Sequence, residues 1–322
     1  MSFEETEEQL GHFSEFIHQG WELASEIILP DKPSSIVVCG MGGSGISGAI
    51  LASYLELDIP IFQIKGYKLP GHIGKNALVF IVSYSGNTEE TISAFRSAMG
   101  RGSHIVGVCS GGKLEKLCAD NKLPCILLPK GLQPRAAIPL LFFPMLRVLH
   151  NSRLIEAQAD YVNKTIETIE KSDYGNMGQA LAEKLKEKIV LIYASEAFGA
   201  VAYRWKTQIN ENAKSMAFSN VIPELNHNEL VSFEHILGDY YVIMLQDEQD
   251  SPRIKKRMKL TKELISSKGV SSTLIAISGT CKLSRLFSAI HMGDYVSLHL
   301  AGLYNIDPNP VHIIEDFKAR LK

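Results

Sequence analysis

The sequence has little that would mark a secreted, membrane-bound or nucleic-acid-binding protein. Its 322 residues carry a formal charge of −2, so no excess of positive charge favours nucleic acid or an anionic membrane. The five cysteines are odd in number and form no C-x-x-C pair, which is typical of reduced thiols rather than of disulfides. No apolar run approaches the roughly 18 residues of a membrane span, and no basic segment precedes an apolar core near the N-terminus. We therefore expect a cytoplasmic protein that binds neither membranes nor nucleic acid.

Signatures of organic cofactors and metals are incomplete. Residues 40–45 satisfy G-x-G-x-x-G between a predicted strand and a predicted helix, but dinucleotide sites also need an acid at the end of the next strand. That strand ends in Gln63-Ile64-Lys65, which disfavours a dinucleotide, and we expect the glycines to allow close approach of another ligand to the backbone. The chain has no G-x-x-x-x-G-K-[ST], no H-E-x-x-H and no Cys/His cluster. We expect neither an organic cofactor nor a metal ion.

Short buried strands alternate with helices along the chain. Strands are predicted at residues 36–39, 59–64, 78–82, 104–109 and 125–128, and again at 189–193, 240–245 and 273–277. This alternation is typical of an α/β protein with doubly wound parallel sheets, each an αβα sandwich. The strand-like runs of the second half echo the order of the first, which indicates two copies of one unit. We predict domains at 1–152, with an amphipathic helix over residues 8–28, and at 153–322.

A polar stretch, Ser83-Tyr84-Ser85-Gly86-Asn87-Thr88, follows one predicted strand and opens onto a helix. Its hydroxyl groups can donate hydrogen bonds, and the free N–H groups and dipole of the helix favour an anion such as phosphate. Ser44, in the glycine-rich segment, is a further donor. Glu89 and Glu90 would satisfy the same dipole without a ligand. From these residues alone, a phosphate site and an ordinary helix cap both remain open.

Three residues are candidates for proton-transfer chemistry. Arg135 follows the fifth predicted strand, where parallel sheets bind ligands, and an arginine there can stabilise a developing oxyanion or form a surface salt bridge. Glu211 lies in the last turn of a predicted helix, and His227 lies in a polar loop. Taken alone, a glutamate or a histidine in such a position is more often a solvated residue without a function. Together, a carboxylate base and an imidazole near a phosphate site would suit proton transfer on a sugar phosphate.

Five motifs together resemble the bifunctional phosphoglucose/phosphomannose isomerases, a family of the phosphoglucose isomerase superfamily with two sugar-isomerase (SIS) domains. The motifs are GMGGSGISG at 40–48, SYSGNTEET at 83–91, QPR at 133–135, WKTQINENAK at 205–214 and PELNHNE at 223–229. The resemblance covers nearly the whole chain. It implies an aldose–ketose isomerase that interconverts glucose 6-phosphate and mannose 6-phosphate with fructose 6-phosphate through a cis-enediolate, without a metal or organic cofactor.

The same resemblance implies a role for each site residue. The substrate phosphate would bind to Gly43, Ser44, Ser83, Ser85 and Thr88. Glu211 would be the catalytic base, and Arg135 would stabilise the charge that develops on oxygen. His227 would open the sugar ring from the neighbouring subunit, which implies a homodimer with its active site at the subunit interface. A C-terminal lysine would assist ring opening; we choose Lys318, and Lys322 is the alternative.

Two other functions remain open at this point. An amino-sugar phosphate isomerase would share the phosphate-binding loop, but it should not need the NENAK and PELNHNE motifs. A non-catalytic SIS module would bind a sugar phosphate as a regulatory signal, and such modules usually accompany an effector domain.

Overall fold

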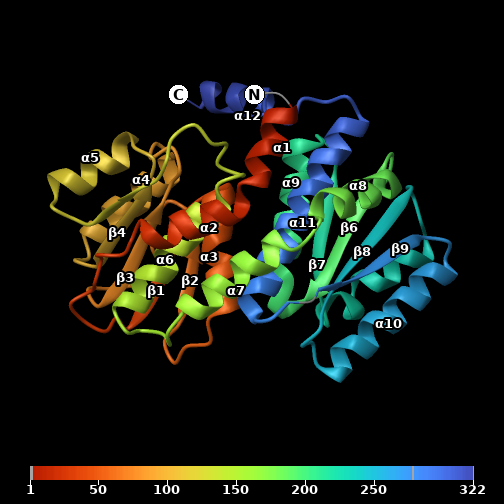
Figure 1. Cartoon of the computed structure of the whole chain (residues 1–322), viewed down its shortest axis with the longest axis horizontal. Coiled ribbons are helices and arrows are strands. Elements are labelled where there is room, and N and C mark those ends of the chain that lie inside the picture. Colours follow the sequence, from red (N-terminus) through yellow and green to blue (C-terminus); the bar gives the residue numbers. More distant parts are fainter. Residues whose placement is uncertain (1–2, 278, 322) are drawn as a thin grey trace. The chain divides into compact units, whose positions relative to one another are not determined.

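The computed structural model describes residues 3–277 and 279–321 of the chain (Figure 1). The chain divides into two compact units. The N-terminal unit comprises His12–Lys171 and Thr280–Leu286, and the C-terminal unit comprises Met1–Gly11, Ser172–Gly279 and Phe287–Lys322. Each unit contains one parallel β-sheet with helices packed against it. The predicted α/β fold with parallel sheets is thereby confirmed.

The sheet of the N-terminal unit has five strands in the spatial order β2-β1-β3-β4-β5. All neighbouring strands are parallel. The central strands β1 and β3 are buried along their whole length, as their unbroken apolar runs predict for a parallel sheet covered on both faces. The strands are β1 (Ser35–Cys39), β2 (Ile61–Ile64), β3 (Ala77–Val82), β4 (His104–Cys109) and β5 (Cys125–Leu127).

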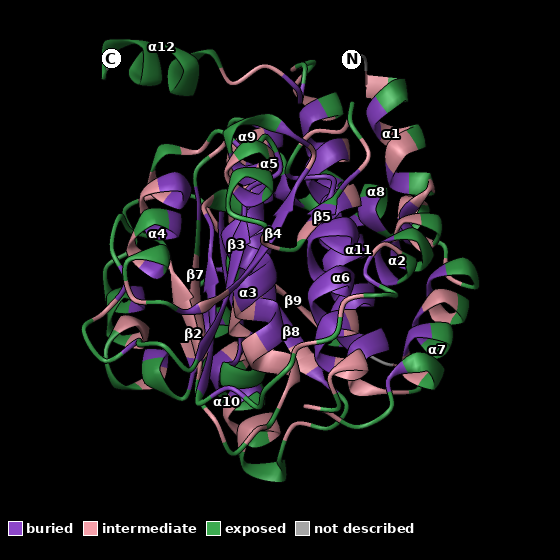
Figure 2. Cartoon of the chain, turned by 90° about the vertical axis from the view of Figure 1, so that its left-hand side faces the viewer, coloured by how far each residue is buried: buried purple, intermediate pink, exposed green. Residues whose placement is uncertain are grey.

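Helices cover both faces of this sheet, and the buried strands lie between them (Figure 2). On one face, Phe95 of α4 and Leu114 of α5 join Val37 and Val79 in one buried cluster. On the other face, α3 packs against α6, and α2 packs against α6 and α7. The helices are α2 (Phe13–Glu22), α3 (Gly42–Tyr54), α4 (Glu89–Met99), α5 (Gly112–Asp120), α6 (Ile138–Asn151) and α7 (Ala159–Glu170).

The sheet of the C-terminal unit has four parallel strands in the order β7-β6-β8-β9. Met258 and Ile265 of α10 pack on Val242 and Met244 at one face, whereas α9 packs against β6 and β7. The strands are β6 (Ile189–Ser195), β7 (Ala217–Ile222), β8 (Tyr240–Asp247) and β9 (Ser271–Ile277). The helices are α1 (Phe3–Gly11), α8 (Tyr174–Leu185), α9 (Gly199–Asn212), α10 (Pro252–Ser267), α12 (His312–Arg320) and, from Phe287 onward, α11 (Lys282–Leu303), whose first residues belong to the N-terminal unit. The 3₁₀ turns are η1 (Glu196–Phe198), η2 (Glu224–His227) and η3 (Glu229–Glu234).

Two features of the fold differ from the sequence-based expectations. Strand β7 was not predicted. The helix predicted over residues 8–28 is two helices, α1 and α2, which end and begin on either side of His12. The N-terminal unit includes the chain up to Lys171, because α7 packs against α2. The division of the chain into domains at 152/153 stays a prediction.

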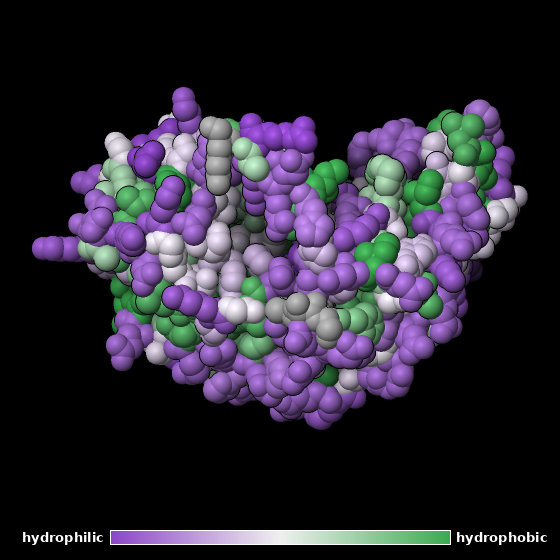
Figure 3. Space-filling model, turned by 90° about the horizontal axis from the view of Figure 1, so that it is seen from above, coloured by the Kyte–Doolittle hydropathy of each residue, from purple (hydrophilic) through white to green (hydrophobic). Residues whose placement is uncertain are grey.

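On the face shown in Figure 3, hydrophobic side chains are scattered among hydrophilic ones. No helix within residues 3–277 or 279–321 combines the length and the apolar character that a membrane span requires.

A buried histidine gives the C-terminal unit a pH-dependent stability. His291 of α11 is 4% exposed and packs edge-on against Tyr174 and Tyr295, and burial lowers its pKa to about 3. A histidine in the unfolded chain has a pKa near 6.5, so between these values the unfolded chain binds one more proton than the folded chain. The free energy of unfolding should therefore fall as the pH drops below about 6.5.

We expect this histidine to contribute a loss of roughly 2 kcal/mol in unfolding free energy between pH 7 and pH 4.5, measured by urea denaturation. The variant His291→Phe, which cannot titrate, should lose correspondingly less over the same interval. Equal losses in the two proteins would show that His291 is not the group responsible.

Candidate functional site

Two loops of the N-terminal unit meet at the carboxyl ends of neighbouring strands. Because β1 pairs with β3, the glycine-rich segment after Cys39 and the segment after Val82 leave the same edge of the sheet. Ser44 lies in the first turn of α3, and its Oγ accepts a hydrogen bond of 3.3 Å from the backbone N–H of Tyr84. The sequence-predicted phosphate residues Ser44 and Ser83 are therefore held side by side.

The hydroxyl groups around this edge do not act as ordinary helix caps. Ser83 Oγ and Thr88 Oγ1 lie 2.9 Å apart and share a hydrogen bond, and Thr88, the N-cap residue of α4, makes no capping hydrogen bond through its side chain. Met41, the N-cap residue of α3, makes none either. The first N–H groups of a helix have no partner within the helix, so two helix N-termini here offer donors and positive potential to an anion. Ser85 is exposed beside them, and its Oγ accepts from the N–H of Asn87.

The loop after β4 supports the loop after β3. The N–H and the Oγ of Ser110 each donate to the carbonyl oxygen of Tyr84 at 2.7 Å, and the N–H of Leu114 donates to the carbonyl oxygen of Gly86 at 2.9 Å. Gly86 has a φ of +66°, and a Cβ built there would lie 1.8 Å from the carbonyl oxygen of Gly111. Only glycine fits this position, so the shape of the loop is fixed before any ligand binds.

The substitution Gly86→Ala should therefore raise KM for a sugar phosphate by about tenfold or more, because the added methyl group forces the loop away from Gly111. Initial-rate kinetics would measure this change. The matched control is Gly71→Ala, since Gly71 has open space around a built Cβ, and its KM should match the wild type. A Gly86→Ala enzyme with unchanged KM would contradict a rigid phosphate-binding loop.

Arg135 lies at the same edge of the N-terminal unit. A Cβ built on Gly43 would lie 3.0 Å from the carbonyl oxygen of Pro134 and 3.5 Å from the Cα of Arg135, so the backbone of residues 134–135 packs directly on the glycine-rich segment. Arg135 itself is 7% exposed. The structure thus brings Gly43, Ser44, Ser83, Ser85, Thr88 and Arg135 to one edge of one sheet.

Glu211, His227 and Lys318 belong to the C-terminal unit, on three different elements. Glu211 is partly exposed in the last turn of α9. The helix ends after Asn212, where Lys214 adopts a left-handed φ of +53° and its Nζ donates to the carbonyl oxygens of Glu211 and Pro308. These contacts satisfy a carbonyl group that the end of a helix leaves without an intrahelical partner.

His227 is exposed at the end of η2 in a loop that is otherwise anchored. The neighbouring Leu225 is fully buried, and Asn226 donates to Thr261 Oγ1 at 2.8 Å and accepts from Arg257 at 3.2 Å. Lys318 is exposed on α12, which has no buried residue. The alternative residue, Lys322, lies outside the described residues.

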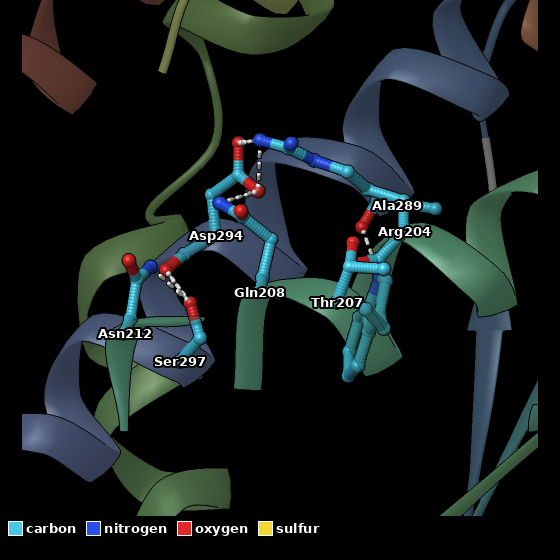
Figure 4. A network of polar contacts seen from close by, with 8 residues as sticks. Arg204, Thr207, Gln208, Asn212, Ala289, Asp294 and Ser297 are labelled. Carbon is cyan, nitrogen blue, oxygen red and sulfur yellow. Dashed lines mark hydrogen bonds and ion pairs between the residues drawn. The ribbon is translucent and has the colours of Figure 1, made fainter. Parts of the chain in front are cut away.

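Sequence reasoning missed the polar network that joins α9 to α11 (Figure 4). Asp294 Oδ1 lies 3.0 Å from Arg204 Nη2 and 2.8 Å from Gln208 Nε2, and Asn212 Nδ2 donates to Ser297 Oγ at 2.9 Å. Burial raises the pKa of Asp294, and the Arg204 charge opposes that rise. Arginine, glutamine and asparagine at four-residue intervals are the one signal in the sequence that points to this face of the helix.

Among residues 3–277 and 279–321, no group of three or more His, Cys, Asp or Glu side chains is arranged to hold a metal ion.

Comparison with known proteins relates the chain to sugar-phosphate enzymes. A family model described as the bacterial phospho-glucose isomerase C-terminal SIS domain matches residues 175–321. The bifunctional phosphoglucose/phosphomannose isomerase of Caldicellulosiruptor bescii is 39% identical over 98% of both chains. The D-glucosamine-6-phosphate 4-epimerase of Sulfolobus acidocaldarius is 28% identical over 94% of this chain and 96% of its own. The solved structure of glucosamine-6-phosphate deaminase from Thermotoga maritima has a TM-score of 0.73 at 15% identity, covering 96% of this chain and 97% of its own, and shows the shared fold.

Proposed function

The chain belongs to the bifunctional phosphoglucose/phosphomannose isomerase family, and we propose that it interconverts glucose 6-phosphate and mannose 6-phosphate with fructose 6-phosphate. The observation that carries this proposal is the 39% identity to such an enzyme over 98% of both chains. The two uncapped helix N-termini and the hydroxyl groups beside them support a phosphorylated substrate independently, because they are suited to a dianion.

In the proposed mechanism, Gly43, Ser44, Ser83, Ser85 and Thr88 bind the phosphate of the open-chain sugar. The carboxylate of Glu211 removes the proton from C2 of the aldose. The C–H electron pair forms the C1=C2 double bond and the π pair of the carbonyl group moves to O1, which gives a cis-enediolate. Arg135 stabilises the negative charge on oxygen, where a positive charge has its largest effect. Glu211 then returns the proton to C1, the hydroxyl proton on O2 moves to O1, and the C2 carbonyl group of fructose 6-phosphate forms.

Both aldoses reach the same intermediate. C2 is planar in the enediolate, so it no longer distinguishes glucose from mannose configuration. Reprotonation at C2 from either face requires rotation about the C2–C3 bond, and we propose that the enzyme permits this rotation.

Ring opening precedes proton transfer in this scheme. His227 and Lys318 are both exposed, which supports the idea that each side chain can reach a bound substrate. We propose that His227 acts on substrate bound by the neighbouring subunit of a homodimer, so that the active site forms at the subunit interface, and that Lys318 assists it. The five cysteines are all free thiols, which supports work in the cytoplasm.

The direct test is the formation of fructose 6-phosphate from each aldose 6-phosphate, with EDTA present and glucosamine 6-phosphate as a third substrate. Turnover of both aldoses in EDTA is the expected result. Turnover of glucose 6-phosphate alone would overturn the dual specificity. Conversion of glucosamine 6-phosphate alone would replace the proposal with an amino-sugar enzyme, and tight binding without any turnover would indicate a regulatory module.

A further inference from the structure

One face of α9 is bound to α11 by polar groups. Arg204, Gln208 and Asn212 recur at intervals of four residues, so they form one stripe along the helix. Figure 4 shows their side chains directed at Asp294 and Ser297 of α11. The stripe extends from the middle of α9 to its last residue.

The centre of this network is Asp294. Its two carboxylate oxygens accept hydrogen bonds of 3.0 and 3.1 Å from Arg204 Nη2, and Oδ1 also accepts from Gln208. The network continues through the backbone, because Ser297 Oγ donates to the carbonyl oxygen of Asp294 at 2.8 Å and accepts from Asn212. The side chains of Arg204 and Asp294 are each 1% exposed, so water does not compete for these bonds.

A buried ion pair of this kind is not a stabilising device in itself. Removing two charges from water costs several kcal/mol, and well-packed apolar side chains usually stabilise the same position equally well. Apolar packing is already present beside the network, since Trp205 is fully buried and its indole N–H donates to the carbonyl oxygen of Ala289. The polar bonds, which need a fixed geometry, instead determine how α9 is rotated about its own axis.

The last turn of α9 is where this rotation matters. Helix ends fray because their carbonyl groups lack intrahelical partners, yet here Gln208 and Asn212 are both anchored. Glu211 lies between them. The Glu211 side chain therefore projects from a helical turn in which residues before and after it, Gln208 and Asn212, are both hydrogen-bonded to α11.

We propose that Asp294 and Ser297 are positioning residues that orient Glu211 through Gln208 and Asn212. This inference rests on the proposed function, in which Glu211 must meet a carbon-bound proton. Catalytic groups act only within a narrow geometry, and a displacement of about 1 Å can cost on the order of 100-fold in rate. Binding of the phosphate, which involves other residues, does not depend on this orientation.

The test uses Ser297→Ala, which removes one hydroxyl group with little change in volume. We expect kcat to fall about tenfold, with KM within twofold and little change in melting temperature. Backbone amides of residues 209–213 should exchange with deuterium faster. The matched control is Ser288→Ala on the same helix: its Oγ is buried without a hydrogen-bond partner among the described residues, so kcat and exchange should match the wild type.

A double variant separates the bond from the individual side chains. If Asn212 and Ser297 act through their hydrogen bond, Asn212→Leu combined with Ser297→Ala should lower kcat no further than Asn212→Leu alone. Wild-type kcat in Ser297→Ala, whatever its amide exchange, would overturn the positioning role, as would additive effects in the double variant. A wild-type chain that converts neither sugar phosphate would instead overturn the proposed function.

Discussion

Replacing Glu211 with glutamine should lower kcat for both aldose 6-phosphates by on the order of 10²–10⁴. The substitution preserves the shape of the side chain in the last turn of α9 but removes the carboxylate that we propose as the proton acceptor. Because the proposed phosphate-binding residues follow strands of the other sheet, we expect the equilibrium affinity for fructose 6-phosphate to change less than threefold. Fixed-time assays of isomerisation would measure kcat. Calorimetric titration of the inactive variant would measure its dissociation constant for fructose 6-phosphate.

The matched control for this experiment is Glu183→Gln, an exposed glutamate on α8 in the same unit. It should retain wild-type kinetics. Near wild-type turnover in Glu211→Gln would exclude this residue as the base. A variant that has lost fructose 6-phosphate binding as well would show that Glu211 holds the substrate rather than moving its proton.

Replacing Arg204 with methionine should lower the free energy of unfolding by about 3–5 kcal/mol. The variant leaves the carboxylate of Asp294 buried with Gln208 but without a compensating charge. Removing Asp294 as well, in Arg204→Met with Asp294→Leu, should restore much of the loss, because the buried charge is then absent. Urea denaturation of the wild type and of these two variants would measure the difference.

The pH dependence provides a second readout of this pair. Burial already raises the pKa of Asp294, and without Arg204 that pKa should rise further. The folded variant then binds a proton that the unfolded chain does not bind, so its deficit relative to the wild type should shrink as the pH falls toward about 4. A pH-independent deficit, or none at neutral pH, would contradict the assignment of a charged buried pair.

The family and the parallel α/β fold could be predicted because their signals are local. Apolar runs such as residues 78–82 specify central strands, and the glycines and serines of residues 83–88 specify the loop that follows. Strand β7 lacked such a signal. Ser219 and Asn220 occupy its middle, and as an edge strand it pairs only with β6, so no continuous apolar run was needed.

The polar network that joins α9 to α11 beside Glu211 could not be predicted from the sequence, and the reason is different. The spacing of Arg204, Gln208 and Asn212 shows which face of α9 they share, but their partners are about 85–90 positions away in the sequence. Only the packing of α11 on α9 determines that Asp294 meets that stripe. The prediction of one helix over residues 8–28 is wrong for a related reason. The apolar spacing continues across Gly11 and His12, but the chain passes there from one compact unit to the other.

The close fit of Gly86 against Gly111 has a consequence for attempts to change the specificity of this protein. The two loops are interlocked backbone to backbone, so neither can be redesigned alone. A combinatorial library that varies residues 83–88 while keeping residues 110–114 fixed would mostly contain misfolded loops. Recombination between relatives should therefore exchange both segments together, so that each new loop keeps the neighbouring loop against which it packs.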